Sequence, residues 1–199
     1  MSPSEKRSLS DKSREKLTAV STATLTTVLF KRGFRNTFIQ GIHRLNPGGP
    51  AMVGPAYTLR YIPAREDLDH LRVFEDRSHP QRKGVEECPP GHVFVIDSRR
   101  TAAAAPTNLI KHHAVDLNVP IACGEVPVYP GDILVGDDEG VAVIPQHIAE
   151  EVAEEAFEQT AFEDFVQEKV AEGRSIFGIY PPGPEAREEF KRWRAANGR

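Results

Sequence analysis

The sequence VYPGDILVGDDEGVAVIP, residues 128–145, decides the fold. Its β-branched runs are separated by two turn sequences, PGD at 130–132 and DDEG at 137–140, whose residue types favour a reversal of the chain. Short apolar runs at 119–123 and 126–129 precede it. Residues 119–145 therefore predict a compact antiparallel meander.

The acids of the second turn, Asp137, Asp138 and Glu139, are candidate cation ligands. The loop lacks the ligand count and the glycine placement of an EF-hand, however. We favour turn carboxylates that accept backbone N–H bonds.

Two further strands and one helix are predicted before this segment, and a second helix is predicted after it. The segment 56–62 alternates and is bounded by prolines, and 91–97 is an apolar run that ends in an acid. Helical periodicity covers 16–30, with Ser21 or Thr22 as cap and Gly33 at the end. It returns over 148–172, with room for one break near Thr160 and a stop at Gly173.

The chain is predicted to be one domain, residues 1–199. Residues 1–15 are expected to be a flexible N-terminus. Residues 174–199 are expected to form an extended apolar arm over 176–184 and a short helix over 185–195, which Pro184 opens. A helix that short is marginal alone, so it should dock on the body or on a neighbouring subunit.

Composition sets limits on the class of protein. Hydrophobic residues make up 39% and charged residues 27% of 199, which is typical of a folded soluble domain. The net charge of −4 disfavours nucleic acid as the main ligand. The two cysteines, Cys88 and Cys123, have no zinc-site spacing, and no apolar run suits a signal or membrane segment. We expect a cytoplasmic location and no membrane partner.

The 128–145 sequence resembles the C-terminal signature of the RraA-like superfamily. That group includes 4-hydroxy-4-methyl-2-oxoglutarate aldolases, oxaloacetate decarboxylases and regulators of ribonuclease E, and its members often carry a menaquinone methyltransferase label. Similar segments occur in the expected order along nearly the whole chain: STATL at 21–25, GPAYTLR at 54–60, IPARED at 62–67, PPG at 89–91, VFVID at 93–97 and APTNL at 105–109. The resemblance implies an α/β fold, a layered swivelling β/α/β domain, and homo-oligomers that are trimers or dimers of trimers.

The chain departs from that family at one place. Between the segments that match 93–97 and 106–108, members carry a Gly-rich turn that opens a helix, then a strand that ends in Asp-Gly followed by Arg-Asp. Here the interval is only SRRTAAAA, residues 98–105. Either the chain has lost a strand–helix–strand unit or the sequence omits one. Omission is favoured, because a loss would strip buried apolar area from neighbouring strands.

The resemblance implies a chemistry for the absent block. Turn amides would bind a pyruvoyl carboxylate, the Arg would bind the enolate oxygens, and the Asp would help hold Mg²⁺ or Mn²⁺ as a Lewis acid, with no organic cofactor. The expected function is a divalent-metal-dependent lyase that cleaves 4-hydroxy-2-oxo acids or decarboxylates oxaloacetate, provided that the block exists. The alternative is a non-catalytic binding or regulatory protein. A methyltransferase is disfavoured because no Gly-rich nucleotide loop follows a strand.

No catalytic or metal-binding residue can be assigned while that block is absent. Six charged residues in loops or at strand ends are candidates to line a cleft: Arg65, Glu66, Asp67, Arg99, Arg100 and Glu125. The plainer interpretation of 65–67 is a surface ion pair, that of 99–100 is a solvated loop, and that of Glu125 is a turn acid. His112 and His113 are a weaker pair, because neighbours on an extended segment point to opposite faces and rarely share one ion.

Overall fold

A computed structural model of the chain describes residues 9–46, 48–97 and 112–198. Its α-helices are α1 (Asp11–Thr18), α2 (Thr22–Lys31), α3 (Pro80–Glu87), α4 (Ala149–Ala171) and α5 (Pro184–Asn197). Its strands are β1 (Phe38–Ile39), β2 (Met52–Pro63), β3 (Val93–Asp97), β4 (His112–Leu117), β5 (Ile121–Cys123), β6 (Val126–Val128), β7 (Ile133–Gly136) and β8 (Val141–Ile144). Two short 3₁₀ helices, η1 (Leu71–Phe74) and η3 (Gln146–Ile148), precede α3 and α4.

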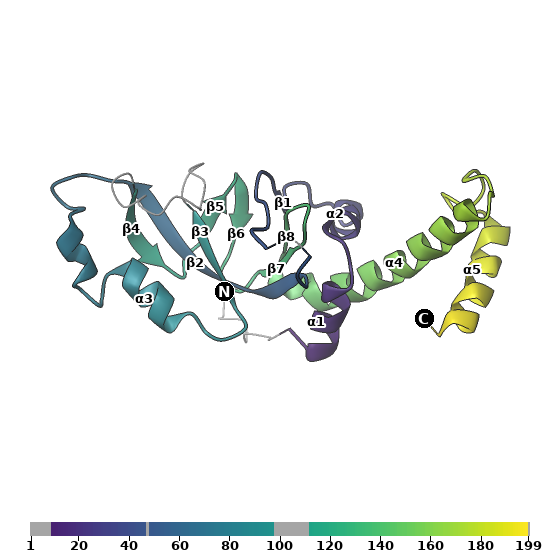
Figure 1. The fold of residues 1–199 in the computed structure, drawn as a ribbon, viewed down its shortest axis with the longest axis horizontal. Coiled ribbons are helices and arrows are strands. Elements are labelled where there is room, and N and C mark those ends of the chain that lie inside the picture. Colours follow the sequence, from purple (N-terminus) through teal and green to yellow (C-terminus); the bar gives the residue numbers. More distant parts are fainter. Residues whose placement is uncertain (1–8, 47, 98–111, 199) are drawn as a thin grey trace.

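Strand β2 is the centre of the main sheet, whose order is β1-β8-β7-β2-β3 (Figure 1). Its first residues pair antiparallel with β7, from Met52 to Pro55. Its second half pairs parallel with β3 and antiparallel with β4. A single twelve-residue strand thus joins three others that are distant in sequence. The predicted strand at 56–62 is confirmed, but it begins four residues earlier.

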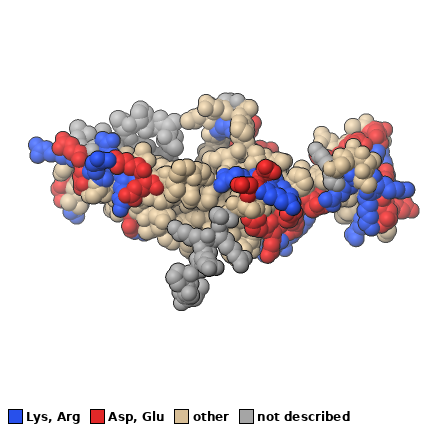
Figure 2. Space-filling view, turned by 90° about the horizontal axis from the view of Figure 1, so that it is seen from below, with Lys and Arg blue, Asp and Glu red and all other residues tan. Residues whose placement is uncertain are grey.

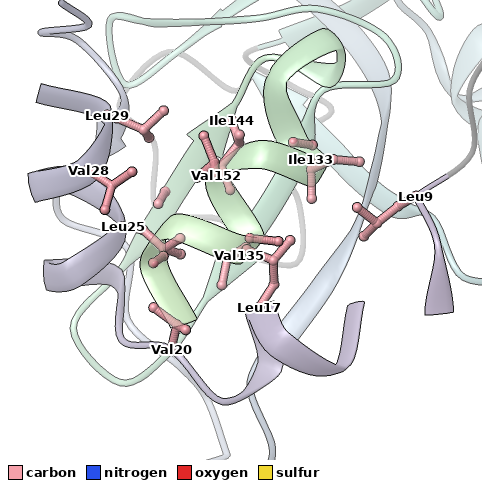
Figure 3. Packing of buried hydrophobic residues seen from close by; sticks show 14 residues of the cluster. Leu9, Leu17, Val20, Leu25, Val28, Leu29, Ile133, Val135, Ile144 and Val152 are labelled. Carbon is pink, nitrogen blue, oxygen red and sulfur yellow. The ribbon is translucent and has the colours of Figure 1, made fainter. Parts of the chain in front are cut away.

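The apolar runs of β7 and β8 are buried on both faces of the sheet. Ile133 and Val135 of β7 pack with helices α1, α2 and α4 on one face, as Figure 3 shows. Leu134, between them, points to the opposite face and packs with the β5–β6 hairpin. Because side chains alternate along a strand, a continuous apolar run is what a strand covered on both faces requires.

A third cluster lies under α3. Leu59, Tyr61 and Ala114 are buried there, with Phe94 and Leu117 against them. Gly84 of α3 lets the helix approach closely, since a Cβ at that position would stand 2.7 Å from the Phe94 ring. Helix α3 therefore covers the face of β2, β3 and β4 that carries these residues.

The N-terminal helix differs from its prediction. The structure has two helices, because Ser10 caps α1 and Ser21 caps α2, each by accepting a bond from a backbone N–H three residues on. Ser21 was predicted as a cap, and Gly33 ends α2 with the expected positive φ of 94°. The expectation of a flexible chain through residue 15 is wrong from Leu9 onward, since Leu9 and Leu17 belong to the core.

The predicted meander is two separate hairpins. β5 pairs with β6 in a two-stranded sheet, whereas β7 and β8 belong to the main sheet. The turn at 129–132 explains the separation. The carboxylate of Asp132 accepts the Tyr129 N–H at 2.9 Å, and the chain is turned away from β6 before β7 begins. The antiparallel pairing within each hairpin is as predicted.

The C-terminal region is compact where an extended arm was expected. Residues 174–183 form turns, because Ile179 is buried against Phe165 of α4. Phe162, Phe190 and Trp193 complete this small cluster, which we call the C-terminal cluster. Helix α4 is unbroken at Thr160, whose hydroxyl donates to the Ala156 carbonyl within the helix. Pro184 opens α5 as predicted, and Figure 1 shows α4 carrying the cluster away from the sheet.

Candidate functional site

A cleft of about 310 Å³ lies beside the carboxyl ends of the parallel strands β2 and β3. Small-molecule sites of α/β sheets are found at the carboxyl ends of parallel strands, and their volumes begin near about 300 Å³. Its lining comes from β2, the end of β3 and the β5–β6 hairpin with its flanks: Arg60, Tyr61, Ile62, Asp97, Pro120, Ile121, Ala122, Pro127 and Tyr129.

Among the described residues, Arg60 is the basic residue of this lining. Its Cα is paired with Asp97 of β3 on one side and with Asp116 of β4 on the other. The guanidinium forms an ion pair with the Asp116 carboxylate, and both side chains are 44% exposed. At that exposure an ion pair contributes about 0–1 kcal/mol, so an incoming anion can compete for the guanidinium.

The predicted candidates lie elsewhere. Arg65 and Asp67 form an exposed ion pair with each other, 2.7 Å between Nε and Oδ1, in the turn after β2. Glu66 is exposed between them. Glu125 has a φ of 69° in the β5–β6 turn, where its backbone carbonyl accepts a bond from Asn36. These four do not line the cleft, while Arg99 and Arg100 lie outside the described residues.

The acids at 137–139 are structural. Asp137 accepts bonds from the backbone N–H groups of Glu139 and Gly140 and from both the N–H and the hydroxyl of Thr22. Burial acts to raise the pKa of Asp137, but these bonds together lower it. Asp138 contacts Arg44, 3.3 Å from Oδ1 to Nε. The interpretation as turn carboxylates is confirmed for Asp137.

Among the described residues, the side chains of the cleft do not by themselves form a complete site for Mg²⁺ or Mn²⁺. Among residues 9–46, 48–97 and 112–198, no three His, Cys, Asp or Glu side chains converge on a point that could hold a metal. Asp116 is paired with Arg60, and Asp97 is the carboxylate within the described lining. The sequence from 98 to 111 contains no Asp, Glu, His or Cys. Mg²⁺ takes one or two carboxylates from a protein and keeps several waters, so Asp97 supplies at most part of such a site.

A second group of polar residues surrounds the carboxyl end of β2 on the β4 side. His113 of β4 donates from Nδ1 to Oδ1 of Asp69, 3.0 Å away in the connection between β2 and α3. The ring of His79 lies 5.6 Å from the ring of His113 at 66°. Burial, then the charge of His113, lowers the pKa of His79. Tyr61 lies beside the group, and burial raises its pKa to about 12.

These groupings were missed in the sequence for an identifiable reason. Arg60, Asp97 and Asp116 become neighbours only through the pairing of β2 with β3 and β4, and no local spacing encodes that pairing. One signal was present: Arg60 interrupts the apolar strand TLRYI at 58–62. A charge inside such a strand indicates a polar contact at that position. For His112 and His113, the expected opposite orientations agree with their different partners, Tyr61 and Asp69.

Among the described residues, the face seen in Figure 2 does not concentrate one sign of charge. Figure 2 shows Lys and Arg intermingled with Asp and Glu over the face in view, with an uncharged stretch between the charged regions. Nucleic-acid surfaces concentrate one sign of charge. In the part of the chain that the structure describes, no helix has both the length and the apolar composition needed to cross a bilayer.

Comparison with known proteins gives a consistent family. The model of a family described as RraA-like, Aldolase/RraA, matches residues 99–143. A relative from Halalkalibacterium halodurans, named "Putative 4-hydroxy-4-methyl-2-oxoglutarate aldolase", is 40% identical over 87 residues, 44% of this chain. That match covers only 40% of the length of the relative.

Solved structures share the fold at low sequence identity. An uncharacterized protein from Pseudomonas syringae pv. tomato superposes with a TM-score of 0.74 at 18% identity, over 92% of this chain and 100% of that one. RraAS2 from Streptomyces coelicolor, described as an unusual member of the RNase ES inhibitor RraA protein family, has a TM-score of 0.64 at 23% identity, over 81% and 98%. At these identities the likeness concerns the fold alone.

Proposed function

We propose that this chain is a member of the RraA-like superfamily and a lyase that cleaves or decarboxylates small 2-oxo acids in the cleft beside Arg60. The observation that carries the proposal is the position of this cleft at the carboxyl ends of β2 and β3, with Arg60 in its lining. The name of the Halalkalibacterium relative supports the reaction class.

Arg60 binds the substrate in this proposal. A guanidinium presents a planar fork of donors that matches a carboxylate, and the exposed Asp116 is displaced when the substrate carboxylate takes its place. The apolar walls, Ile121 and Pro127 among them, then face the carbon chain. The volume of about 310 Å³ suits an acid of a few carbons.

Asp97 is the proposed base for aldol cleavage. Its carboxylate takes the proton of the 4-hydroxyl group, the C3–C4 bond breaks, and its electron pair passes to the enolate of pyruvate beside Arg60. Decarboxylation of oxaloacetate leaves the same enolate and CO₂ and needs no base. A divalent ion, which the aldolase resemblance suggests, has no side-chain site among the described residues, so neither step is drawn through one.

A coupled assay tests the proposal. Pyruvate release from oxaloacetate and from 4-hydroxy-4-methyl-2-oxoglutarate is followed with lactate dehydrogenase, in Mg²⁺, in Mn²⁺ and in chelator, with a protein-free blank for spontaneous decarboxylation. We expect release above the blank that Arg60→Gln reduces at least about tenfold, the effect of losing one charge-assisted contact. Arg65→Gln is the matched control, because Arg65 pairs only with exposed Asp67 in the turn. Equal activity in the two variants would refute the role of Arg60.

A second candidate is a non-catalytic binding protein, favoured by the missing Arg-Asp motif in SRRTAAAA at 98–105. It predicts a folded protein that binds a 2-oxo acid without releasing pyruvate in any of the three buffers. Calorimetric titration with oxalate, a stable enolate mimic, measures the binding alone. An intact mass of 22.1 kDa shows that no further block is present in the polypeptide under assay.

We also propose that the chain self-associates, as the resemblance implies. Apolar side chains are exposed at the turn between α4 and α5, with Phe177 88% exposed and Ile176 beside it. Exposed aromatic residues of this kind are typical of contact surfaces. Light scattering coupled to size exclusion should give a multiple of the chain mass, which Phe177→Ser would reduce.

A further inference from the structure

A long-range side-chain bond joins the connection between β2 and α3, residues 64–79, to β4. The Nδ1–H of His113 donates to Oδ1 of Asp69, a residue 44 positions away in the chain. The Asp69 side chain is only 5% exposed, and that of His113 is 21% exposed. The bond therefore lies inside the protein, where its electrostatic contribution is larger than on the surface.

Asp69 places a negative charge where little water reaches. Its second oxygen, Oδ2, is buried and has no hydrogen-bond partner among the described residues. A buried carboxylate in that state is costly unless a positive charge stands beside it. His113 supplies the ring donor that this carboxylate contacts.

His79 stands next to that pair and is poorly placed to carry a charge of its own. Its ring is buried, 5.6 Å from His113, and its residue is the N-cap of α3 without a capping bond from the side chain. A cation at a helix N-terminus opposes the helix dipole, and a second cation beside an imidazolium is repelled.

The groups around His79 act in both directions. Burial and His113 lower the pKa of His79, whereas Asp69 and Asp76 act to raise it, and the balance is below its ordinary value of 6.5. From β2, Tyr61 adds no charge below its pKa of about 12. From β4, His112 packs edge-on against Tyr61, 6.3 Å between ring centres.

We propose that Asp69, His79 and His113 form an acid-sensitive latch, which fastens residues 64–79 to β4 near neutral pH and releases them when His79 takes up a proton. The sign follows from linkage. The latched form keeps His79 neutral, so the released form binds more protons once the pH falls below the ordinary histidine value. The latch is fully stable above that value and weakens as the pH falls through the lower pKa of the latched form.

Hydrogen exchange, with histidine titration by NMR, tests the latch in the full-length protein. Amides of residues 64–79 are compared at about pH 7.5 and about pH 5, with rates corrected for the intrinsic pH dependence of exchange. We expect a several-fold loss of protection at the lower pH in the wild type. His79→Asn, which cannot titrate, should show the same protection at both values. Asp69→Asn should be unprotected at both.

His92→Asn is the matched control, since His92 is exposed in the turn before β3 and should leave the wild-type response unchanged. The latch is refuted if the wild type is equally protected at both pH values, or if His79→Asn loses protection as the wild type does. It is also refuted if His79 titrates at or above its ordinary value. If Asp69→Asn does not fold, the protection of the His79→Asn variant and the NMR titration of His79 still test the latch.

Discussion

Asp137 joins the turn between β7 and β8 to the start of α2. Its carboxylate accepts from the Thr22 N–H at 2.7 Å and the Thr22 hydroxyl at 2.9 Å. It also closes its own turn by accepting from Glu139 and Gly140. A carboxylate at the first residue of a helix is further favoured by the helix dipole.

Asp137→Ala should lower the free energy of unfolding by about 1–3 kcal/mol, because it leaves several donors without their acceptor. The contribution depends on pH with a defined sign. Although burial acts against it, hydrogen bonding holds the pKa of Asp137 below its ordinary 3.8. The stabilisation is present above pH 3.8 and is lost as the pH falls through the lower folded value.

Urea unfolding at about pH 7 and about pH 3 measures this effect, since titration should shrink the difference between wild type and variant at the lower pH. Asp138→Asn is the control: Asp138 is largely exposed and contacts only Arg44, so its loss should change little. A variant difference that is the same at both pH values would contradict the assignment.

Residue types in turns were predictable, and contacts between strands were not. Asp137 and Gly33 follow from local chemistry, because a turn acid binds its own backbone and a glycine accepts a positive φ. Arg60, by contrast, meets Asp116 through a pairing that spans 56 residues. Asp69 and His113 meet in the same way across 44 residues. Nothing in either local sequence specifies the partner.

At the scale of elements, the residues that lead into β3 lie in close contact with its parallel neighbour β2. A Cβ on Gly54 of β2 would stand 2.6 Å from the carbonyl oxygen of Gly91 and 3.1 Å from the Val93 side chain. The first of these is backbone, which cannot rotate away. The glycine thus permits the approach that the parallel β2–β3 pair requires.

Gly54→Ala should therefore destabilise the protein by about 1–3 kcal/mol, the range for overpacking, although alanine loses less chain entropy than glycine on folding. Gly49→Ala is the matched control, because its Cβ would meet nothing closer than 3.7 Å. The midpoint of urea unfolding should fall for the first variant and stay near wild type for the second. An unchanged midpoint for Gly54→Ala would show that β3 can shift.

Element types were predicted better than their arrangement. The alternating and apolar runs gave β2, β3, β7 and β8, and the periodicity over 148–172 gave α4. The division of 119–145 into two sheets depends on Asp132, which turns the chain, and on the β2–β7 pairing. The compact 174–183 turns depend on Ile179 finding Phe165. Both are tertiary effects that override a local pattern.

At the scale of the whole molecule, two of the protein's apolar clusters share one helix, and we call them the two centres. The N-terminal half of α4 packs with α1, α2 and the sheet through residues such as Val152. Its C-terminal half carries Phe165 in the C-terminal cluster. No buried residue of one centre belongs to the other.

The two centres should unfold at different denaturant concentrations. Trp193, the only tryptophan, lies in the C-terminal cluster, so its fluorescence reports that centre, while far-ultraviolet circular dichroism reports mainly the rest. We expect the fluorescence midpoint to lie lower, because the smaller cluster buries less apolar area. Coincident midpoints would show one cooperative unit.

Two large-to-small variants sharpen that comparison. Phe165→Ala, which removes a fully buried ring, should lower the fluorescence midpoint with a local loss of about 3–5 kcal/mol. Leu29→Ala, equally buried but in the other centre, should lower the circular dichroism midpoint instead. Equal shifts of both midpoints in either variant would count against two centres.

Because β2 is central, it must wait during synthesis for partner strands that lie later in the chain. Its partners β3, β4 and β7 follow it in the chain, and the last of them ends at Gly136, more than seventy residues after Pro63. At about 5–20 residues per second, a ribosome takes several seconds to deliver them. During that interval β2 has emerged with both edges unsatisfied, which makes this strand the segment most in need of a chaperone on the nascent chain.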